Sequence, residues 1–163
     1  MNHPDTAISI YNLANLYAYQ NKYSKAEMLY ERALVIYENA VEFGSQNTIV
    51  AEFLNGLANV YSYKNKYNLA EKFYLRSLEI KENAQQNFPN EIAIGQALQN
   101  LGNLYAKQKL YSKADLYYLR ALDMFKKIED VNSRLSNQAR TIGNRATLAM
   151  SQKLYGNAHP HQL

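Results

Sequence analysis

The sequence predicts an all-α fold built from repeated antiparallel helical hairpins, and three observations support this. Ala, Leu, Glu, Lys and Gln crowd the periodic stretches, and these residues favour helices. The 163 residues include only three prolines and six glycines, so long uninterrupted helices are possible. The chain also repeats itself every 44 residues, which is the signature of a repeat architecture.

The repeat is clearest in three aligned segments, 13–17, 57–61 and 101–105, which read LANLY, LANVY and LGNLY. The same register continues downstream at five further positions, occupied by Tyr23, Tyr67 and Tyr111; Ala26, Ala70 and Ala114; Tyr30, Tyr74 and Tyr118; Arg32, Arg76 and Arg120; and Ala33, Ser77 and Ala121. A fourth copy begins, because residues 153–158 match residues 109–114. We therefore expect three full hairpins and one extra helix.

These matches set the expected organisation of the chain. We predict one repeat array over residues 1–163, with repeats at about 4–44, 45–88 and 89–130 and a partial fourth repeat at 131–163. In the first copy the first helix is expected at about 5–20 and the second at about 24–41.

Start signals for the helices come from polar residues and prolines. The second helices are predicted to begin at Ser24, Asn68 and Ser112, each of which precedes an acidic residue by three positions, as in a capping box. The first helices are expected to start after residues 4–6, 46–48 and 89–91, where proline and polar residues stop the preceding chain and cap the next helix.

The repeated residues resemble the tetratricopeptide repeat, whose pattern places Leu, a small residue, Tyr, Ala, an aromatic residue and Ala at fixed offsets. The matching residues are Ile10, Leu13, Ala14, Tyr17, Ala26, Tyr30 and Ala33; Leu54, Leu57, Ala58, Tyr61, Ala70, Tyr74 and Ser77; and Leu98, Leu101, Gly102, Tyr105, Ala114, Tyr118 and Ala121. The resemblance implies a right-handed α-α superhelix, or solenoid. The usual period is about 34 residues. The longer period here and the opening His3-Pro4-Asp5-Thr6-Ala7 are similar to the subgroup typified by kinesin light chain.

The fourth copy departs from the pattern. Arg145 lies where Leu is expected and Ala149 where Tyr is expected. We interpret the polar stretch 132–152 as a helix that caps the array, since terminal repeats must meet water on one face. The alternative is a chain cut within a repeat.

The resemblance also implies where a partner binds, because the first helices of the family's hairpins line a concave groove. The residue after the small Ala or Gly points into that groove, which selects Asn15, Asn59, Asn103 and, in the fourth copy, Thr147. The family's other groove positions fall on Tyr11, Tyr19, Glu52, Asn55, Tyr63, Gln96, Gln99, Lys107 and Arg140. Asparagine amides can grip an extended peptide backbone, and tyrosines can form side-chain pockets. The alternative is that the asparagines form hydrogen bonds between helices.

Several other functions are disfavoured by the sequence. The family variant that clamps a C-terminal carboxylate of chaperones needs Lys and Arg where this chain has Tyr11, Gln96 and Asn100. The histidines His3, His159 and His161 lie near the chain ends, and no phosphate-binding loop or nucleophile motif is present. We expect no enzyme activity, no cofactor and no metal.

Charge and cysteine content limit the partners and the location. The net charge is +4 without a run of five or six like charges, so nucleic acid is not indicated. The repeated arginines at 32, 76 and 120 are solvated or paired between repeats, or else form a phosphate-tracking ridge. The chain has no cysteine, no visible signal peptide and no apolar stretch near the roughly 18 residues of a membrane span, so the cytoplasm is expected.

These observations leave three functional hypotheses in order. The first is a module that binds a protein or an extended peptide rather than a small-molecule substrate. The second is a structural scaffold that forms a homodimer through the C-terminal helix at about 140–155. The third is a nucleic-acid binder that uses the excess of basic residues.

Overall fold

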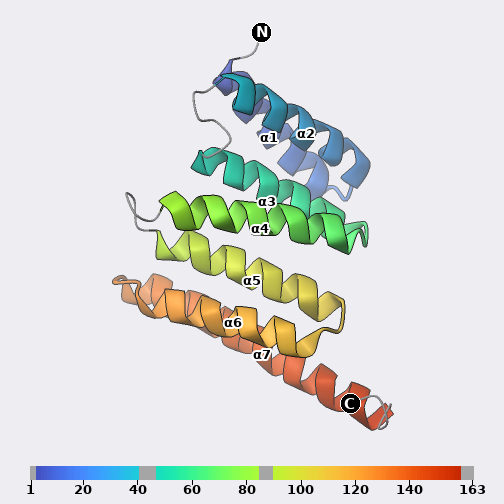
Figure 1. Ribbon diagram of the computed structural model, residues 1–163, viewed down its shortest axis with the longest axis vertical. Coiled ribbons are helices and arrows are strands. Elements are labelled where there is room, and N and C mark those ends of the chain that lie inside the picture. The colour runs from blue at the N-terminus through green and yellow to red at the C-terminus, as the bar shows by residue number, and fades with distance from the viewer. Residues whose placement is uncertain (1–2, 41–46, 85–89, 159–163) are drawn as a thin grey trace. The chain divides into compact units, whose positions relative to one another are not determined.

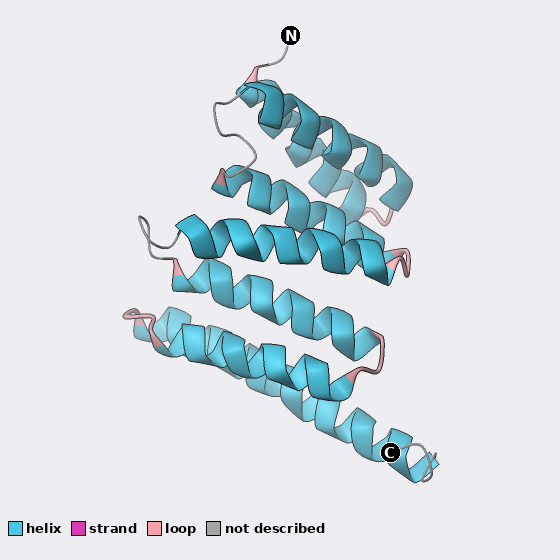
Figure 2. Ribbon diagram, in the orientation of Figure 1, coloured by secondary structure: helices cyan, strands magenta, loops and turns pink. Residues whose placement is uncertain are grey.

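The chain is helical in every element of the computed structural model, which describes residues 3–40, 47–84 and 90–158, the side chains of 154–158 excepted. These residues form seven helices and no strand (Figure 2). The helices are α1 (Pro4–Tyr19), α2 (Tyr23–Ala40), α3 (Thr48–Tyr63), α4 (Tyr67–Ala84), α5 (Glu91–Lys107), α6 (Tyr111–Lys126) and α7 (Val131–Ala158). The predicted all-α repeat fold is confirmed, with three hairpins and one further helix (Figure 1).

The chain divides into two compact units at the boundary between the second and third predicted repeats. The N-terminal unit, residues 1–88, contains α1 to α4, and each helix packs against the next. The C-terminal unit, residues 89–163, contains α5 to α7, where α5 packs on α6 and α6 packs on α7. The single array over the whole chain and its right-handed path stay predictions.

A short turn with one left-handed residue joins the two helices of each hairpin. The left-handed residues are Asn21, Asn65 and Lys109, with φ angles of 59°, 58° and 60°. In the first turn, the N–H of Lys22 donates to the carbonyl of Tyr17 at 2.9 Å and the N–H of Asn21 donates to that of Ala18 at 2.9 Å. This is the Schellman arrangement, which satisfies the last carbonyls of the first helix. The asparagines suit it, because Asn adopts the left-handed region more readily than most residues.

The predicted starts of the second helices need correction. These helices begin at Tyr23, Tyr67 and Tyr111, so the proposed capping residues lie inside them. The N-cap of α6 is Leu110, which makes no side-chain cap hydrogen bond, so the capping box predicted at Ser112 is wrong. The starting tyrosines instead reach back to the turn: the hydroxyl of Tyr67, for example, donates to Asn65 Oδ1 at 2.8 Å.

The starts of the first helices agree better with the sequence. Asn47 Oδ1 accepts the N–H of Ile49 at 2.9 Å, and Asn90 Oδ1 accepts the N–H of Ala93 at 3.0 Å. Each bond satisfies a backbone donor at a helix start that has no partner within the helix.

Small residues set the separation of the helices in each hairpin. A Cβ atom added to Gly95 of α5 would lie 2.2 Å from Cε1 of Phe125, whose ring is fully buried. One added to Gly102 would lie 2.6 Å from Cε1 of Tyr118. Ala14, at the position equivalent to Gly102, is completely buried in the first hairpin. These positions let an aromatic ring of the second helix lie against the backbone of the first.

Helix α7 is longer than predicted. It has 28 residues and runs through Gln152, Lys153 and Leu154, although the same three residue types form the turn at 108–110 in the third hairpin. A left-handed Lys at such a turn costs about 1–2 kcal/mol, which packing of the two helices of a hairpin must offset. In the described residues no second helix packs on α7, so the straight helix is preferred.

Candidate partner-binding surface

The three asparagines singled out by the sequence each bond to a tyrosine of the following helix. The hydroxyl of Tyr30 donates to Asn15 Oδ1 at 2.5 Å, and that of Tyr74 donates to Asn59 Oδ1 at 2.5 Å. In the third hairpin the hydroxyl of Tyr118 donates to Asn103 Oδ1 at 2.7 Å. The inter-helix bond considered as the alternative to groove contact is therefore present in all three hairpins.

These bonds fix the orientation of the asparagine side chains. Burial raises the pKa of Tyr30 and of Tyr118 to about 12, and it also raises the pKa of Tyr74. The hydroxyls therefore stay protonated at neutral pH and act as donors. Each asparagine carbonyl oxygen faces its tyrosine, and the amide N–H donors take no part in that bond. The inter-helix bond and contact with a partner are thus compatible.

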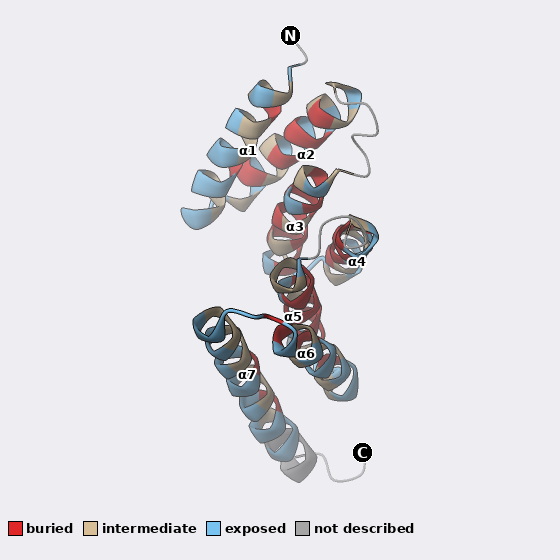
Figure 3. Cartoon of the chain, turned by 90° about the vertical axis from the view of Figure 1, so that its left-hand side faces the viewer, coloured by how far each residue is buried: buried red, intermediate tan, exposed pale blue. Residues whose placement is uncertain are grey.

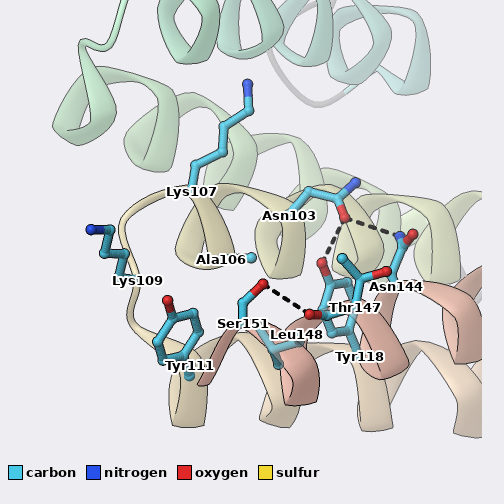
Figure 4. A pocket seen from close by; sticks show the side chains of 10 residues that line it. All are labelled: Asn103, Ala106, Lys107, Lys109, Tyr111, Tyr118, Asn144, Thr147, Leu148 and Ser151. Atoms are coloured by element: carbon cyan, nitrogen blue, oxygen red, sulfur yellow. Dashed lines mark hydrogen bonds between the residues drawn. The ribbon is translucent and has the colours of Figure 1, made fainter. Parts of the chain in front are cut away.

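Two adjoining pockets lie between α5 and α7 in the C-terminal unit. Their volumes are about 470 and 500 Å³, and Asn103 and Asn144 line both. Figure 4 shows the first pocket, with Asn103 receiving hydrogen bonds from Tyr118 and from Nδ2 of Asn144, the latter at 3.1 Å. The first pocket is lined by Asn103, Ala106, Lys107, Lys109, Tyr111, Tyr118, Asn144, Thr147, Leu148 and Ser151. The second is lined by Gln96, Gln99, Asn100, Asn103, Arg140 and Asn144.

Every groove position predicted in the C-terminal unit lines one of these pockets. Lys107 and Thr147 line the first, Gln96 and Arg140 the second, and Asn103 both. The groove positions that the sequence suggested for residues 89–158 therefore converge in space.

Gln99 plays a different part from the other predicted positions. Its side chain is only 4% exposed, and its Nε2 donates to Thr141 Oγ1 of α7 at 2.9 Å. It holds α5 against α7 beneath the second pocket and does not present its amide to a partner in this conformation.

Sequence reasoning missed several lining residues, notably Asn100, Asn144 and Ser151. They lie three or four positions from predicted groove residues, which places them on the same helix face. That spacing was the available signal.

Burial also affects the basic side chains of the pocket. It lowers the pKa of Lys107, because removing the ammonium group from water disfavours its charged form. Lys107, Lys109 and Arg140 are the charged residues that line the two pockets, and no carboxylate lines either one.

In the N-terminal unit the predicted positions lie on α1 and α3, the first helices of their hairpins. Tyr19 is 89% exposed and Tyr63 is 59% exposed. The Tyr63 ring also stacks on Tyr23, with centroids 5.1 Å apart. Asn15 is exposed, whereas Asn59 is half-buried, as is the predicted groove residue Asn55.

Tyr11 and Glu52, the other predicted positions of this unit, have structural contacts. The Tyr11 ring stacks on Phe53 with centroids 4.7 Å apart, and burial raises the pKa of its hydroxyl. Glu52 pairs with the buried Lys81 at 2.8 Å.

The repeated arginines do not share one environment. Arg76 forms an ion pair with Glu38 of the preceding hairpin, as expected for pairing between repeats. Arg120 lies over the Tyr117 ring, 5.4 Å from its centroid, and Arg32 is exposed. Their different contacts favour local pairing over a phosphate-binding ridge.

The basic excess belongs to the second half of the chain. Residues 89–163 contain ten Lys and Arg against five Asp and Glu, a net charge of +5. Residues 1–88 contain eight against nine, a net charge of −1. A partner that responds to charge is therefore expected at the C-terminal unit.

Within the described ranges, no helix is both long and apolar enough to serve as a membrane span. The same residues contain no group of three or more His, Asp or Glu side chains that could hold a metal ion. His159 and His161 lie outside the described residues.

A family model described as "Tetratricopeptide repeat" matches residues 2–39 and 50–127. The chain belongs to the tetratricopeptide repeat family. The resemblance noted in the sequence is thus confirmed, and its long-period form is supported by solved structures. A comparison with curated protein sequences finds no match.

Three solved structures show the same fold. The chain is similar to BtubC (BKLC) from P. vanneervenii, with a TM-score of 0.80 and 24% identity over 92% of this chain and 58% of that one. It is similar to a putative kinesin light chain with TPR-like repeats from Podosopora anserina, with a TM-score of 0.68 and 17% identity over 96% and 74% of the two chains. It is also similar to the N-terminal domain of stress-induced protein-1 from C. elegans, with a TM-score of 0.59 and 24% identity over 83% and 96%. The chain spans little more than half the length of BtubC.

Membership of this family gives the coarse function. Tetratricopeptide repeats are protein–protein interaction modules, and their fold is generally a non-enzymatic scaffold. The surface that makes the contact and the nature of the partner need a separate argument.

Proposed function

We propose that this tetratricopeptide repeat chain binds an extended segment of a partner protein along the surface between α5 and α7. The observation that carries the proposal is the pair of adjoining pockets that share Asn103 and Asn144. Pockets of this size suit a peptide and its side chains.

The length of the surface sets the length of the segment. From Gln96 to Lys107 the α5 helix advances eleven residues, or roughly 16 Å at 1.5 Å per residue. An extended peptide advances about 3.3 Å per residue. The surface therefore accommodates about five residues of a partner.

The lining chemistry favours main-chain recognition. Gln96, Asn100, Asn103 and Asn144 supply amide groups, which donate to peptide carbonyls and accept from peptide N–H groups. Because Asn103 already uses its oxygen toward Tyr118, it is expected to bind a partner through its N–H donors. The absence of a carboxylate from both linings favours carbonyl oxygens and acidic side chains in the segment.

The same proposal extends to the N-terminal unit. Asn15, Asn59 and Asn55 would contact the peptide backbone there, and the exposed rings of Tyr19 and Tyr63 would receive its side chains. A cytoplasmic location, expected from the cysteine-free sequence, stays a prediction.

The test begins with peptides selected on the wild-type chain from a library of random linear sequences. Their affinities are then measured by fluorescence anisotropy for wild type and for the double variant Gln96→Ala/Asn144→Ala. We expect at least a tenfold loss of affinity, equivalent to about 1.4 kcal/mol. Asn39→Ala, which changes an exposed amide on α2, is the matched control and should bind normally. Equal binding of every selected peptide to wild type and the double variant would refute the proposal.

A homodimer through the C-terminal helix is the second candidate, because α7 exposes apolar side chains. The charge of the same helix opposes this pairing, as argued next.

A further inference from the structure

Helix α7 has its polar and apolar faces reversed relative to a normal surface helix. Four large apolar side chains are exposed: Val131 (50%), Leu135 (56%), Ile142 (56%) and Met150 (68%). Ala139, Ala146 and Ala149 are exposed between them. At about 100° per residue these seven residues form one continuous stripe, called here the α7 stripe. Figure 3 shows how little of α7 is buried compared with α3.

The face of α7 that packs on its own unit is mostly polar. Gln99 bonds to Thr141, and Arg145 forms a two-point ion pair with Asp115 of α6 at 2.6 and 3.2 Å. Leu148 is the buried leucine of this face. An exposed apolar stripe opposite a polar packed face indicates that the stripe has a partner of its own.

The repeat register identifies what kind of element the stripe receives. Ala139, Ile142 and Ala146 occupy the positions of Gly95, Leu98 and Gly102 in the third repeat and of Ala51, Leu54 and Ala58 in the second. In those repeats this face is buried against the second helix of the hairpin. At Gly95 and Gly102 the covering rings come from α6.

The small residues of the stripe keep the geometry of a helix-docking face. Ala139 and Ala146 stand where small residues admit an aromatic ring close to the helix backbone. A helix that inserts into lipid would be expected to carry bulky apolar or aromatic residues at such positions. The stripe thus favours a docked helix over a lipid surface.

Charge then selects the class of helix. Between Val131 and Ala158, α7 carries Arg134, Arg140, Arg145 and Lys153 and no carboxylate. Two copies of α7 packed together would place eight positive charges along one interface, which opposes a homodimer. An acidic helix is complementary to this charge.

We propose that the α7 stripe is the docking site for a single acidic, amphipathic helix of a partner protein. The helix takes the place of a second repeat helix and completes the fourth hairpin. It carries small and aromatic residues at the spacing of Ala114, Tyr118 and Ala121, with Asp or Glu on its exposed sides. This site is separate from the groove, because Asn144 and Ser151 point to the opposite side of α7.

The probe is a fluorescein-labelled peptide with the sequence of residues 111–128 in which every Lys and Arg is replaced by Glu. The control probe has the same apolar residues, with every Asp and Glu replaced by Lys. We expect the acidic probe to bind the full chain at least tenfold more tightly than the control, to gain helical circular dichroism on binding, and to weaken with added salt.

Substitutions on the stripe decide the site. Ile142→Gln and Ala146→Gln change exposed positions, so the fold should persist, and each should weaken the acidic probe at least tenfold. Val35→Gln, at an exposed apolar position of α2, should not. Gln96→Ala/Asn144→Ala should also leave this binding unchanged, which separates the stripe from the groove proposal.

Three results would overturn the inference. The first is equal binding of the acidic probe to wild type and to Ile142→Gln and Ala146→Gln. The second is a dimer in light scattering that these substitutions abolish, which would assign the stripe to a second copy of the chain. The third is displacement of the probe by vesicles of phosphatidylserine and phosphatidylcholine, which would assign it to a lipid surface.

Discussion

The bond between Tyr74 and Asn59 joins the two helices of the second hairpin, and breaking it from either side should have unequal costs. The Tyr74 side chain is 4% exposed, whereas Asn59 is half-buried. Asn59→Ala leaves a buried hydroxyl without its acceptor, which costs about 1–3 kcal/mol. Tyr74→Phe leaves a carbonyl oxygen that water can reach, so it should cost only about 0.5–1.5 kcal/mol.

The double variant Asn59→Ala/Tyr74→Phe should recover much of the loss, because neither polar group then remains without a partner. We expect it to be at least about 1 kcal/mol more stable than the sum of the single changes predicts. Urea denaturation followed by circular dichroism measures the four free energies of unfolding. Tyr67→Phe is the control, because its similar bond to Asn65 is exposed and should contribute less than about 0.5 kcal/mol. Additive effects, or a Tyr74→Phe variant less stable than Asn59→Ala, would refute this reasoning.

Three further predictions concern other positions. Gly95→Ala should lower the free energy of unfolding by about 1–2 kcal/mol, since overpacking against a fully buried ring outweighs the gain in helix propensity, whereas Gly143→Ala, with open space around it, should raise stability by about 0.5–1 kcal/mol; urea midpoints test both, and the same sign for the two would contradict the packing. Because the pKa of Tyr30 is raised to about 12 from an ordinary value near 10, stability should be complete below pH 10 and decline as the pH rises toward 12; Tyr30→Phe should flatten that decline, and an unchanged slope in alkaline unfolding curves would count against the assignment. Arg145→Met should cost no more than about 1 kcal/mol because its ion pair with Asp115 is more than one third exposed, and thermal unfolding should show that the effect shrinks with salt.

Much of the fold follows from the sequence because the repeat is dense. Ala14, Ala58 and Gly102 fall at one position, and only small residues fit where helices approach closely. The turn chemistry was harder to read. Asn21 and Asn65 suit a left-handed turn, but Lys109 takes the same conformation, and Ser24 and Ser112 suggested helix starts that the tyrosines before them occupy.

The candidate site was predictable only in part. A position in the register shows which face of a helix a residue lies on, and this placed Asn103 and Arg140 beside the same pockets. It does not show which side chains are already bonded. Gln99 is buried by Thr141 of a helix that departs from the repeat pattern, so its loss from the groove could not be seen in the sequence. The same departure hid the α7 stripe.

The most direct test of binding between α5 and α7 uses the side-chain amide signals of the groove. A chain labelled with ¹⁵N is titrated with a peptide selected on the wild type, and the N–H₂ resonances are followed by nuclear magnetic resonance. The account predicts that the signals of Gln96, Asn100, Asn103 and Asn144 shift together and saturate with the bound fraction, while that of Asn39 stays in place. Saturable binding that leaves those four signals unmoved would contradict it.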